Sequence, residues 1–183
     1  MRRVCVFCGS SNGQNKTIIE SANFFGRLLA KSNLGLVYGG GGIGLMGIIA
    51  DAVLDAGGEV IGVLPDWLAK NEVAHEGLTQ MHLVKSMHER KKMMYELSDA
   101  FVCLPGGMGT MDELFEILTW AQLDLHNKPC AILNIDNYYD HLLAHFKQME
   151  NLGFVSKKHS QLLYVTSDPE EVLRKLNLLS HSE

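Results

Sequence analysis

The sequence contains no apolar run that approaches the roughly 20 residues needed to span a membrane as a helix. Basic residues are also few: 16 lysines and arginines stand against 21 acidic residues, and no basic stripe extends beyond residues 90–92. We therefore expect neither a membrane nor a nucleic-acid polymer as a partner. Residues 1–4 lead directly into an expected strand without the apolar stretch of a signal peptide, so a cytoplasmic location is expected.

Several familiar catalytic signatures are missing as well. The sequence has neither a Gly-x-Ser-x-Gly elbow nor a Gly-x-x-x-x-Gly-Lys-Ser/Thr loop, which removes the commonest hydrolase and NTPase classes. His141 and His145 have the spacing of two zinc ligands on a helix, but the glutamate of His-Glu-x-x-His is absent. Cys5 and Cys8 would face opposite sides of a strand, which argues against a redox pair or a zinc site. We expect no metal and no cofactor.

Short apolar runs alternate with segments of helical periodicity through most of the 183 residues. Strands are expected at residues 4–8, 35–38, 59–64, 81–84, 100–104, 130–135 and 162–165, and helices at 16–32, 45–56, 87–97, 111–123, 138–151 and 169–178. This alternation predicts an α/β fold, a Rossmann-like, doubly wound parallel sheet of about seven strands with helices on both faces. The chain length fits one domain, residues 1–183.

Ligands bind open parallel sheets at the carboxyl ends of the strands, near the point where the strand order reverses. Three segments rich in glycine or serine, residues 9–11, 39–42 and 106–107, leave expected strands at that edge. Residues 65–80 show no clean period and are expected to form a loop or a short helix over the strand ends. The sequence therefore predicts a binding site at this edge.

The most informative segment is residues 105–113, Pro-Gly-Gly-Met-Gly-Thr-Met-Asp-Glu, which joins an expected strand to an expected helix. Unpaired amide groups and the helix dipole at such a point favour a phosphate, and glycines let it approach the backbone closely. Asp112 and in part Glu113 are also typical of a helix start. Glu113 and Glu116 share one helix face. Since a carboxylate repels a phosphate, Glu113 would act on the rest of the substrate, as a base toward water or a ribose hydroxyl.

Two further patterns leave alternatives open. Gly42, Gly44 and Gly47 form a literal Gly-x-Gly-x-x-Gly, but no acid ends the next expected strand, since Glu59 precedes its apolar run 60–64 and Asp66 lies beyond Pro65. Tight packing or phosphate contact is therefore favoured over nicotinamide binding. Arg90 begins an expected helix after a strand, and it either lies on a solvated basic face or reaches a phosphate or a carboxylate across the cleft.

Two motifs together resemble the LOG (Lonely Guy) family of cytokinin riboside 5′-monophosphate phosphoribohydrolases. They are Pro105-Gly106-Gly107-x-Gly109-Thr110-x-x-Glu113 and Met87-His88-x-Arg90-Lys91. The likeness extends through most of the chain. It implies hydrolysis of the N-glycosidic bond of a nucleoside 5′-monophosphate, giving a free base and ribose 5-phosphate. Family members are often labelled lysine decarboxylases, but nothing in this sequence supports a pyridoxal site.

The resemblance implies that Arg90 and Glu113 are the catalytic pair. It also implies a set of substrate-contacting positions: Ser10, Gly39, Gly40, Gly41, Glu72, Met87, Lys91, Gly106, Gly107, Met108, Gly109, Thr110, Glu116 and Thr119. Members of the family are typically homodimers with the site close to the subunit interface, so a homodimer is expected here. The base pocket is not placed by the sequence: Phe7, Met108, Trp120 and residues 65–80 are candidates, and each is equally compatible with the core.

Two alternatives to cytokinin release are open at this point. One is a broader nucleosidase that acts on AMP or related purine nucleotides. The other is a non-catalytic nucleotide or cofactor carrier, which the presence of both Arg90 and Glu113 disfavours. Binding without product formation would distinguish the carrier from either enzyme.

Overall fold

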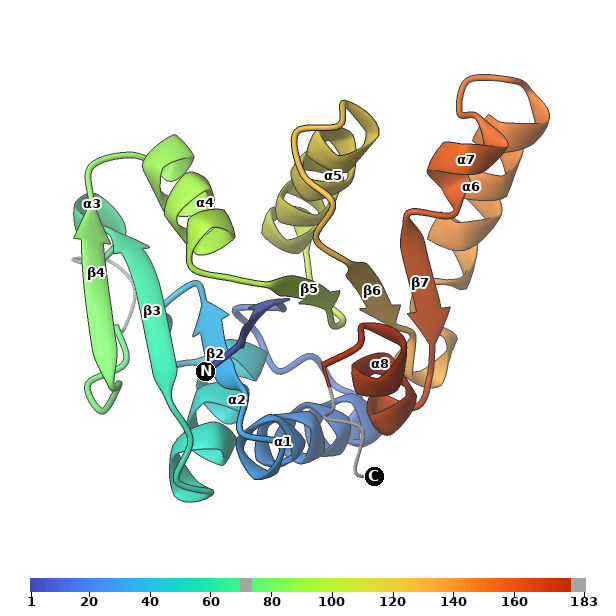
Figure 1. Ribbon diagram of the computed structural model, residues 1–183. Helices are drawn as coiled ribbons and strands as arrows, with labels where there is room; N and C mark the ends of the chain where they lie inside the picture. Colours follow the sequence, from blue (N-terminus) through green and yellow to red (C-terminus); the bar gives the residue numbers. More distant parts are fainter. Residues whose placement is uncertain (70–73, 179–183) are drawn as a thin grey trace.

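The computed structural model describes residues 1–69 and 74–178 and contains one seven-stranded sheet. The strands are β1 Arg3–Phe7, β2 Gly35–Tyr38, β3 Val60–Pro65, β4 Gln80–Val84, β5 Ala100–Cys103, β6 Cys130–Leu133 and β7 Leu163–Thr166. Every neighbouring pair is parallel, and the strand order is β4-β3-β2-β1-β5-β6-β7 (Figure 1). The predicted Rossmann-like parallel sheet is confirmed.

Helices cover both faces of this sheet (Figure 1). They are α1 Lys16–Lys31, α2 Gly44–Asp55, α3 Asp66–Ala69, α4 Met87–Glu96, α5 Met108–Gln122, the 3₁₀ turn η1 Ile135–Asn137, α6 Asp140–Asn151, α7 Lys157–Ser160 and α8 Pro169–Lys175. One hydrophobic cluster packs α1, α2 and α8 against the sheet, and a second packs α4, α5 and α6 against the other face. Cys5 and Cys8 belong to different clusters, as their strand spacing predicts.

The order of the strands reverses between β1 and β5, which lie side by side at the centre of the sheet. From β1 the chain proceeds outward through β2, β3 and β4, then returns to β5 and proceeds the other way. The loops that leave β1 and β5 are joined by a hydrogen bond from Gly9 N to Pro105 O of 3.1 Å. This reversal is the position at which ligands bind open α/β sheets.

Three local features differ from the expected elements. α5 begins at Met108, three residues early, because Gly107 is already its extended N-cap. The expected strand at 130–135 ends at Leu133, since Asp136 and Asn137 adopt positive φ angles of 51° and 59° and turn the chain. The short helix α7 was not predicted. In the 65–80 segment, α3 supplies the expected short helix.

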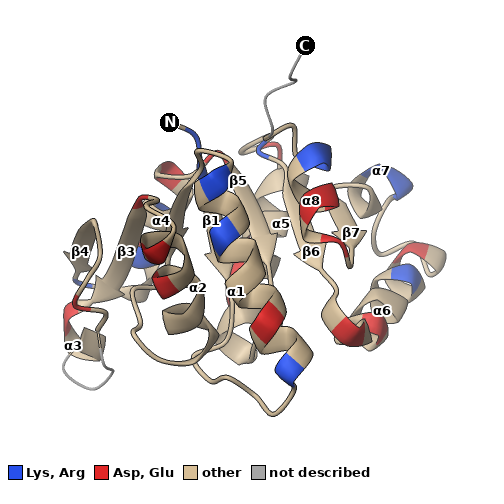
Figure 2. Ribbon diagram, turned by 90° about the horizontal axis from the view of Figure 1, so that it is seen from below, with Lys and Arg blue, Asp and Glu red and all other residues tan. Residues whose placement is uncertain are grey.

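Charged residues are interspersed on the surface. In the view of Figure 2, α1 and α6 each carry both basic and acidic positions, and no continuous basic stripe runs across the elements. Within residues 1–69 and 74–178, no helix has the length and apolarity that crossing a bilayer requires.

Candidate active site

The glycine-rich loop after β5 combines close packing with open space. A Cβ atom at Gly106 would lie 2.1 Å from Thr110 Oγ1 and 2.9 Å from Gly9 N, so only glycine fits there. At Gly107 and Gly109 a Cβ atom would meet nothing within 4 Å. Gly107 is the N-cap of α5 and has no side chain to bind the first amide groups of the helix. These amides therefore remain available to an anion.

A pocket of about 260 Å³ lies over this loop. Its lining comes from the loop after β1, from α1 and α2, from the loop after β5 and from the turn before α6: Gly9, Ser10, Ser11, Asn12, Gly13, Ile18, Leu45, Pro105, Gly106, Gly107 and Tyr138. The structure thus brings Ser10 together with Gly106 and Gly107, although they are almost a hundred residues apart. Arg90 and Glu113 are not part of this lining.

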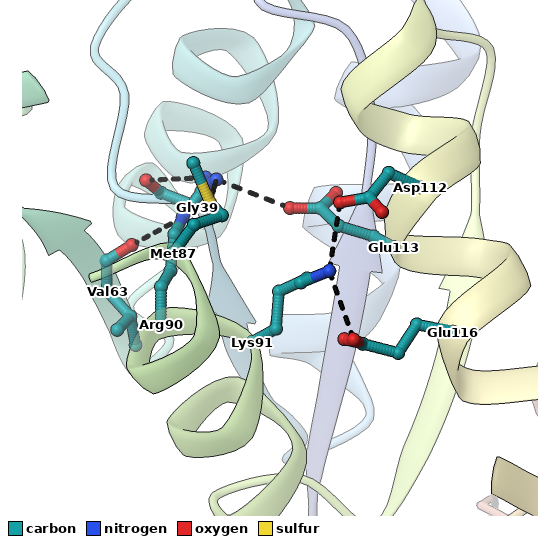
Figure 3. A network of polar contacts seen from close by, with 8 residues as sticks. All are labelled: Gly39, Val63, Met87, Arg90, Lys91, Asp112, Glu113 and Glu116. Carbon is teal, nitrogen blue, oxygen red and sulfur yellow. Dashed lines mark hydrogen bonds and ion pairs between the residues drawn. The ribbon is translucent and has the colours of Figure 1, made fainter.

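Arg90 is buried at the start of α4, with 8% of its surface exposed. Its Nε donates to Val63 O at 3.0 Å, and its Nη2 donates to Gly39 O at 3.1 Å. The Nη1 atom lies 3.5 Å from Glu113 Oε1 (Figure 3). Of the two alternatives for Arg90, the structure therefore selects pairing with a carboxylate across the cleft. A Cβ atom at Gly39 would lie 2.0 Å from Nη2, so this glycine makes room for the guanidinium.

Glu113 lies in the second turn of α5 and is 9% exposed. Burial raises the pKa of its carboxyl to about 7, although the nearby Arg90 acts in the opposite direction. A group with this pKa exchanges its proton near neutral pH. That property is typical of a catalytic acid or base.

Lys91 connects α4 to α5 beside this pair. Its Nζ lies 3.0 Å from Asp112 Oδ2 and 3.1 Å from Glu116 Oε1 (Figure 3). Burial disfavours the charged amine, but the hydrogen bonds to Asp112 and Glu116 outweigh it and raise the pKa of Lys91. Lys91 therefore stays protonated and pairs with both acidic side chains beside Glu113, Asp112 and Glu116.

The second glycine-rich segment is built for close packing. A Cβ atom at Gly44, where φ is +67°, would lie 2.2 Å from the carbonyl carbon of Ser10, so the start of α2 sits directly on the first loop. The Arg3 Nε atom lies 2.7 Å from Glu59 Oε2, which holds the Glu59 carboxylate at the amino edge of the sheet. The packing interpretation of Gly-x-Gly-x-x-Gly agrees with this geometry, and the ribose-binding acid of a dinucleotide fold is missing there.

Gly40 and Gly41 hold a neighbouring segment over the strand ends. Gly40 has a φ of +80°, and its carbonyl accepts from His75 N at 3.1 Å. Gly41 forms an isolated bridge with Ala74. The His75 Nε2 atom in turn lies 2.9 Å from Asp51 Oδ1 on α2. Glu72, another expected contact, lies outside the described residues.

Of the remaining residues that were expected to contact the substrate, some lie at the site and one lies in a different cavity. Met87 Sδ lies 3.4 Å from Arg90 Nη1, and Met108 is 89% exposed at the start of α5. Thr119, by contrast, lines a different cavity of about 210 Å³ with side chains from α5, α6 and the α7 region. Phe7 is in the core, whereas Trp120 is partly buried and packs edge-on against Tyr95.

Two tyrosines were missed by the sequence reasoning. Tyr138 Oη donates to Gly106 O at 2.6 Å, and Tyr139 Oη donates to Leu104 O at 2.7 Å. Both belong to the expected helix 138–151, so their position in a turn was not foreseen. The helix-compatible pattern there gave no signal of contact with the loop after β5.

Within the described part of the chain, no group of three or more His, Cys, Asp and Glu side chains is arranged to hold a metal ion.

Comparisons with known proteins place the chain in a family. A family model described as "Possible lysine decarboxylase" matches residues 46–176. The cytokinin riboside 5′-monophosphate phosphoribohydrolase of Rhodococcoides fascians is 47% identical over 170 residues, covering 92% of this chain and 86% of that protein. An enzyme of the same name from Arabidopsis thaliana is 43% identical over 175 residues, covering 96% of this chain and 81% of that protein.

The fold also matches solved structures. The molybdenum cofactor binding protein from Rippkaea orientalis superimposes with a TM-score of 0.72, covering 96% of this chain and 95% of that one. At 22% sequence identity this likeness concerns the fold alone.

Proposed function

Because this chain belongs to the LOG family of cytokinin riboside 5′-monophosphate phosphoribohydrolases, we propose that it releases cytokinin bases from their nucleotides. The reaction is hydrolysis of the N-glycosidic bond of N6-modified adenosine 5′-monophosphates, which gives the free base and ribose 5-phosphate. The observation that carries the proposal for the site is the buried Arg90–Glu113 pair, with 3.5 Å between Nη1 and Oε1, one helical turn beyond a glycine-rich cradle.

The cradle formed by Gly106, Gly107 and the first turn of α5 binds the 5′-phosphate. Its free amides and the dipole of a 15-residue helix favour the negative charge, and Ser10 lines the same pocket. Glu113 lies five residues beyond Met108, or about 8 Å along the helix axis at 1.5 Å per residue. A substrate held by its phosphate thus extends its ribose toward the carboxylate.

Glu113 acts on the anomeric carbon and on the water that attacks it. As the bond between C1′ and the base nitrogen breaks, its electron pair leaves with the base and the ribose gains positive charge. The Glu113 carboxylate stabilises that charge and accepts a proton from the water, whose oxygen bonds to C1′. The departing base takes up a proton, so the reaction is balanced by one water molecule. No metal ion or cofactor takes part.

Arg90 orients Glu113 and favours its charged form. The guanidinium is fixed by the carbonyls of Gly39 and Val63, so it cannot follow the carboxylate if that group moves. Its positive charge lowers the Glu113 pKa against the effect of burial. Without Arg90, a larger share of the enzyme would carry a protonated, inactive Glu113 at neutral pH.

The site residues do not fit lysine decarboxylation. A pyridoxal phosphate enzyme needs a lysine whose amine becomes neutral and forms a Schiff base, which requires a lowered pKa. Lys91, the lysine beside Glu113, is instead held by Asp112 and Glu116 and has a raised pKa.

The protein also acts as a homodimer in this proposal. The cavity between α5 and α6 is lined by apolar side chains, among them Phe115, Phe146 and Met149, and Phe115 remains 38% exposed. Thr119 lies in the same lining, away from Arg90, so its expected substrate contact would be made in the site of a second copy. Phe115→Glu should therefore give a monomer in light scattering, whereas Phe24→Glu, on the exposed side of α1, should leave a dimer. Monomeric wild-type protein would contradict this.

The proposal also covers the domain organisation of the protein and its location in the cell. Residues 1–183 act as one domain around the single sheet, and the protein works in the cytoplasm. The four cysteines are free and buried, which is compatible with a reducing compartment.

The proposal is tested by incubating the purified protein with AMP, N6-isopentenyl-AMP and the two corresponding nucleosides. Free base should appear from the monophosphates only, because the phosphate supplies the positioning energy. Glu113→Gln should slow release by roughly 10²- to 10⁴-fold, and Arg90→Ala should slow it as well. A faster reaction with AMP would assign the broader nucleosidase activity instead, and tight binding without base release would leave a nucleotide carrier.

A further inference from the structure

The loop after β5 is held by four successive carbonyl groups, each with its own donor. Leu104 O accepts from Tyr139 Oη at 2.7 Å, and Pro105 O accepts from Gly9 N at 3.1 Å. Gly106 O accepts from Tyr138 Oη at 2.6 Å, and Gly107 O accepts from Met111 N at 3.1 Å. Two of these donors are neighbouring tyrosines that no motif of the family resemblance includes.

Holding a carbonyl also fixes the amide that follows it. In a trans peptide the C=O group and the next N–H group point in opposite directions, and no described peptide bond in this chain is cis. The bond from Tyr138 to the Gly106 carbonyl therefore sets the direction of the Gly107 amide. Gly107 is the N-cap of α5 and lines the pocket, so this amide is the first donor of the cradle. Gly107 has no side chain that would resist a rotation of this peptide plane.

The conformation of the turn before α6 places the Tyr138 side chain against the loop after β5. Asp136 and Asn137 both have positive φ angles, which non-glycine residues seldom adopt, and the side chain of Asp136 accepts from Asn15 at the start of α1. Asn134 Oδ1 accepts from Tyr139 N at 2.8 Å. Hydrophobic burial does not explain the position of Tyr138, because 48% of its surface is exposed. Its ring stands edge-on to Tyr139 on the wall of the pocket.

We propose that Tyr138 is a positioning residue for the phosphate cradle: its hydroxyl orients the Gly106–Gly107 peptide so that the Gly107 amide binds the phosphate of the substrate. This rests on the proposed function in that the cradle binds a 5′-phosphate. It adds a residue from the turn before α6 to a site otherwise formed by the loops that follow β1, β2 and β5 and by α4 and α5. The effect of Tyr138 should therefore be confined to ligands that carry the phosphate.

The test compares Tyr138→Phe with Tyr164→Phe, which removes a phenolic hydroxyl that is hydrogen-bonded to Glu171 of α8, far from the cradle in sequence. Ribose 5-phosphate and the free base are used as inhibitors, and calorimetry measures ribose 5-phosphate binding without turnover. Tyr138→Phe should weaken ribose 5-phosphate roughly 2- to 10-fold, as expected for one lost hydrogen bond. Its inhibition constant for the free base should not change, and Tyr164→Phe should alter neither ligand.

Three results would overturn the inference. They are unchanged ribose 5-phosphate binding in Tyr138→Phe, equal weakening of both inhibitors, which a general structural defect would cause, and equal weakening of ribose 5-phosphate in both variants. Failure of the proposed function is distinguishable, since it would appear as wild-type protein that releases no base. The calorimetric comparison of the two variants would still decide the role of Tyr138.

Discussion

Glu113→Gln should make the protein more stable at alkaline pH while removing its activity. The carboxyl of Glu113 is 9% exposed, and burial raises its pKa from the ordinary 4.5 to about 7. Between these values the folded protein holds a proton that the unfolded chain has lost. The stability due to this proton is complete below pH 4.5 and is lost as the pH rises through 7. At about 1.4 kcal/mol per pH unit, the total loss is about 3 kcal/mol.

Because glutamine cannot ionise, the free energy of unfolding of the variant does not fall as this proton is lost. Relative to wild type, the free energy of unfolding of Glu113→Gln should increase by about 2 kcal/mol between pH 5.5 and 8.5, the part of the total that falls in this range. Urea unfolding of both proteins at several pH values measures the difference. Glu20→Gln, on the exposed surface of α1, is the matched control and should show no such trend. A difference between Glu113→Gln and wild type that stays constant with pH would refute the reasoning.

Other predictions concern the same site. The rate of base release should rise with pH through about 7 and then level off, because the Glu113 carboxylate is the active form; a pH–rate profile that falls over this range would contradict that role. Arg90→Gln should move the rising limb of the residual activity to higher pH, since Arg90 lowers the Glu113 pKa. Gly106→Ala should cost about 1 to 3 kcal/mol of stability in urea unfolding, because its methyl group would overlap Thr110. Gly107→Ala meets no protein atom, so it should keep the stability of the wild type and lose nucleotide affinity in calorimetry.

The sheet could be predicted from the sequence because each strand is short, apolar and bounded. Runs such as Val4–Cys8 and Ala100–Leu104 are buried on both faces, which leaves a nearly continuous hydrophobic signal. The start of α5 could also be predicted from the sequence, because the backbone conformation at a helix start favours particular residue types. Here these are the glycines of 106–109 and the carboxylates that follow them. The exact start was wrong by three residues, because Gly109 and Thr110 have low helical preference and obscure the beginning of the helix at Met108.

What the sequence could not supply were contacts between distant segments. The pairing of Arg90 with Glu113 depends on how α4 and α5 lie across the switch point, and the sequence alone left Arg90 equally compatible with solvent. Tyr138 gave no signal at all, because its role follows from two left-handed residues that end β6 early. The surroundings of Thr119 show the same limit, since it shares a helix with Glu113 but lines another cavity.

The central claim is tested most directly by measuring both products formed from N6-isopentenyl-AMP. The account predicts that wild-type protein releases N6-isopentenyladenine and ribose 5-phosphate in equal amounts, and that Glu113→Gln is slower by roughly 10²- to 10⁴-fold, the usual effect of losing a general base. Release of inorganic phosphate and the nucleoside instead, or equal rates for wild type and Glu113→Gln, would contradict it.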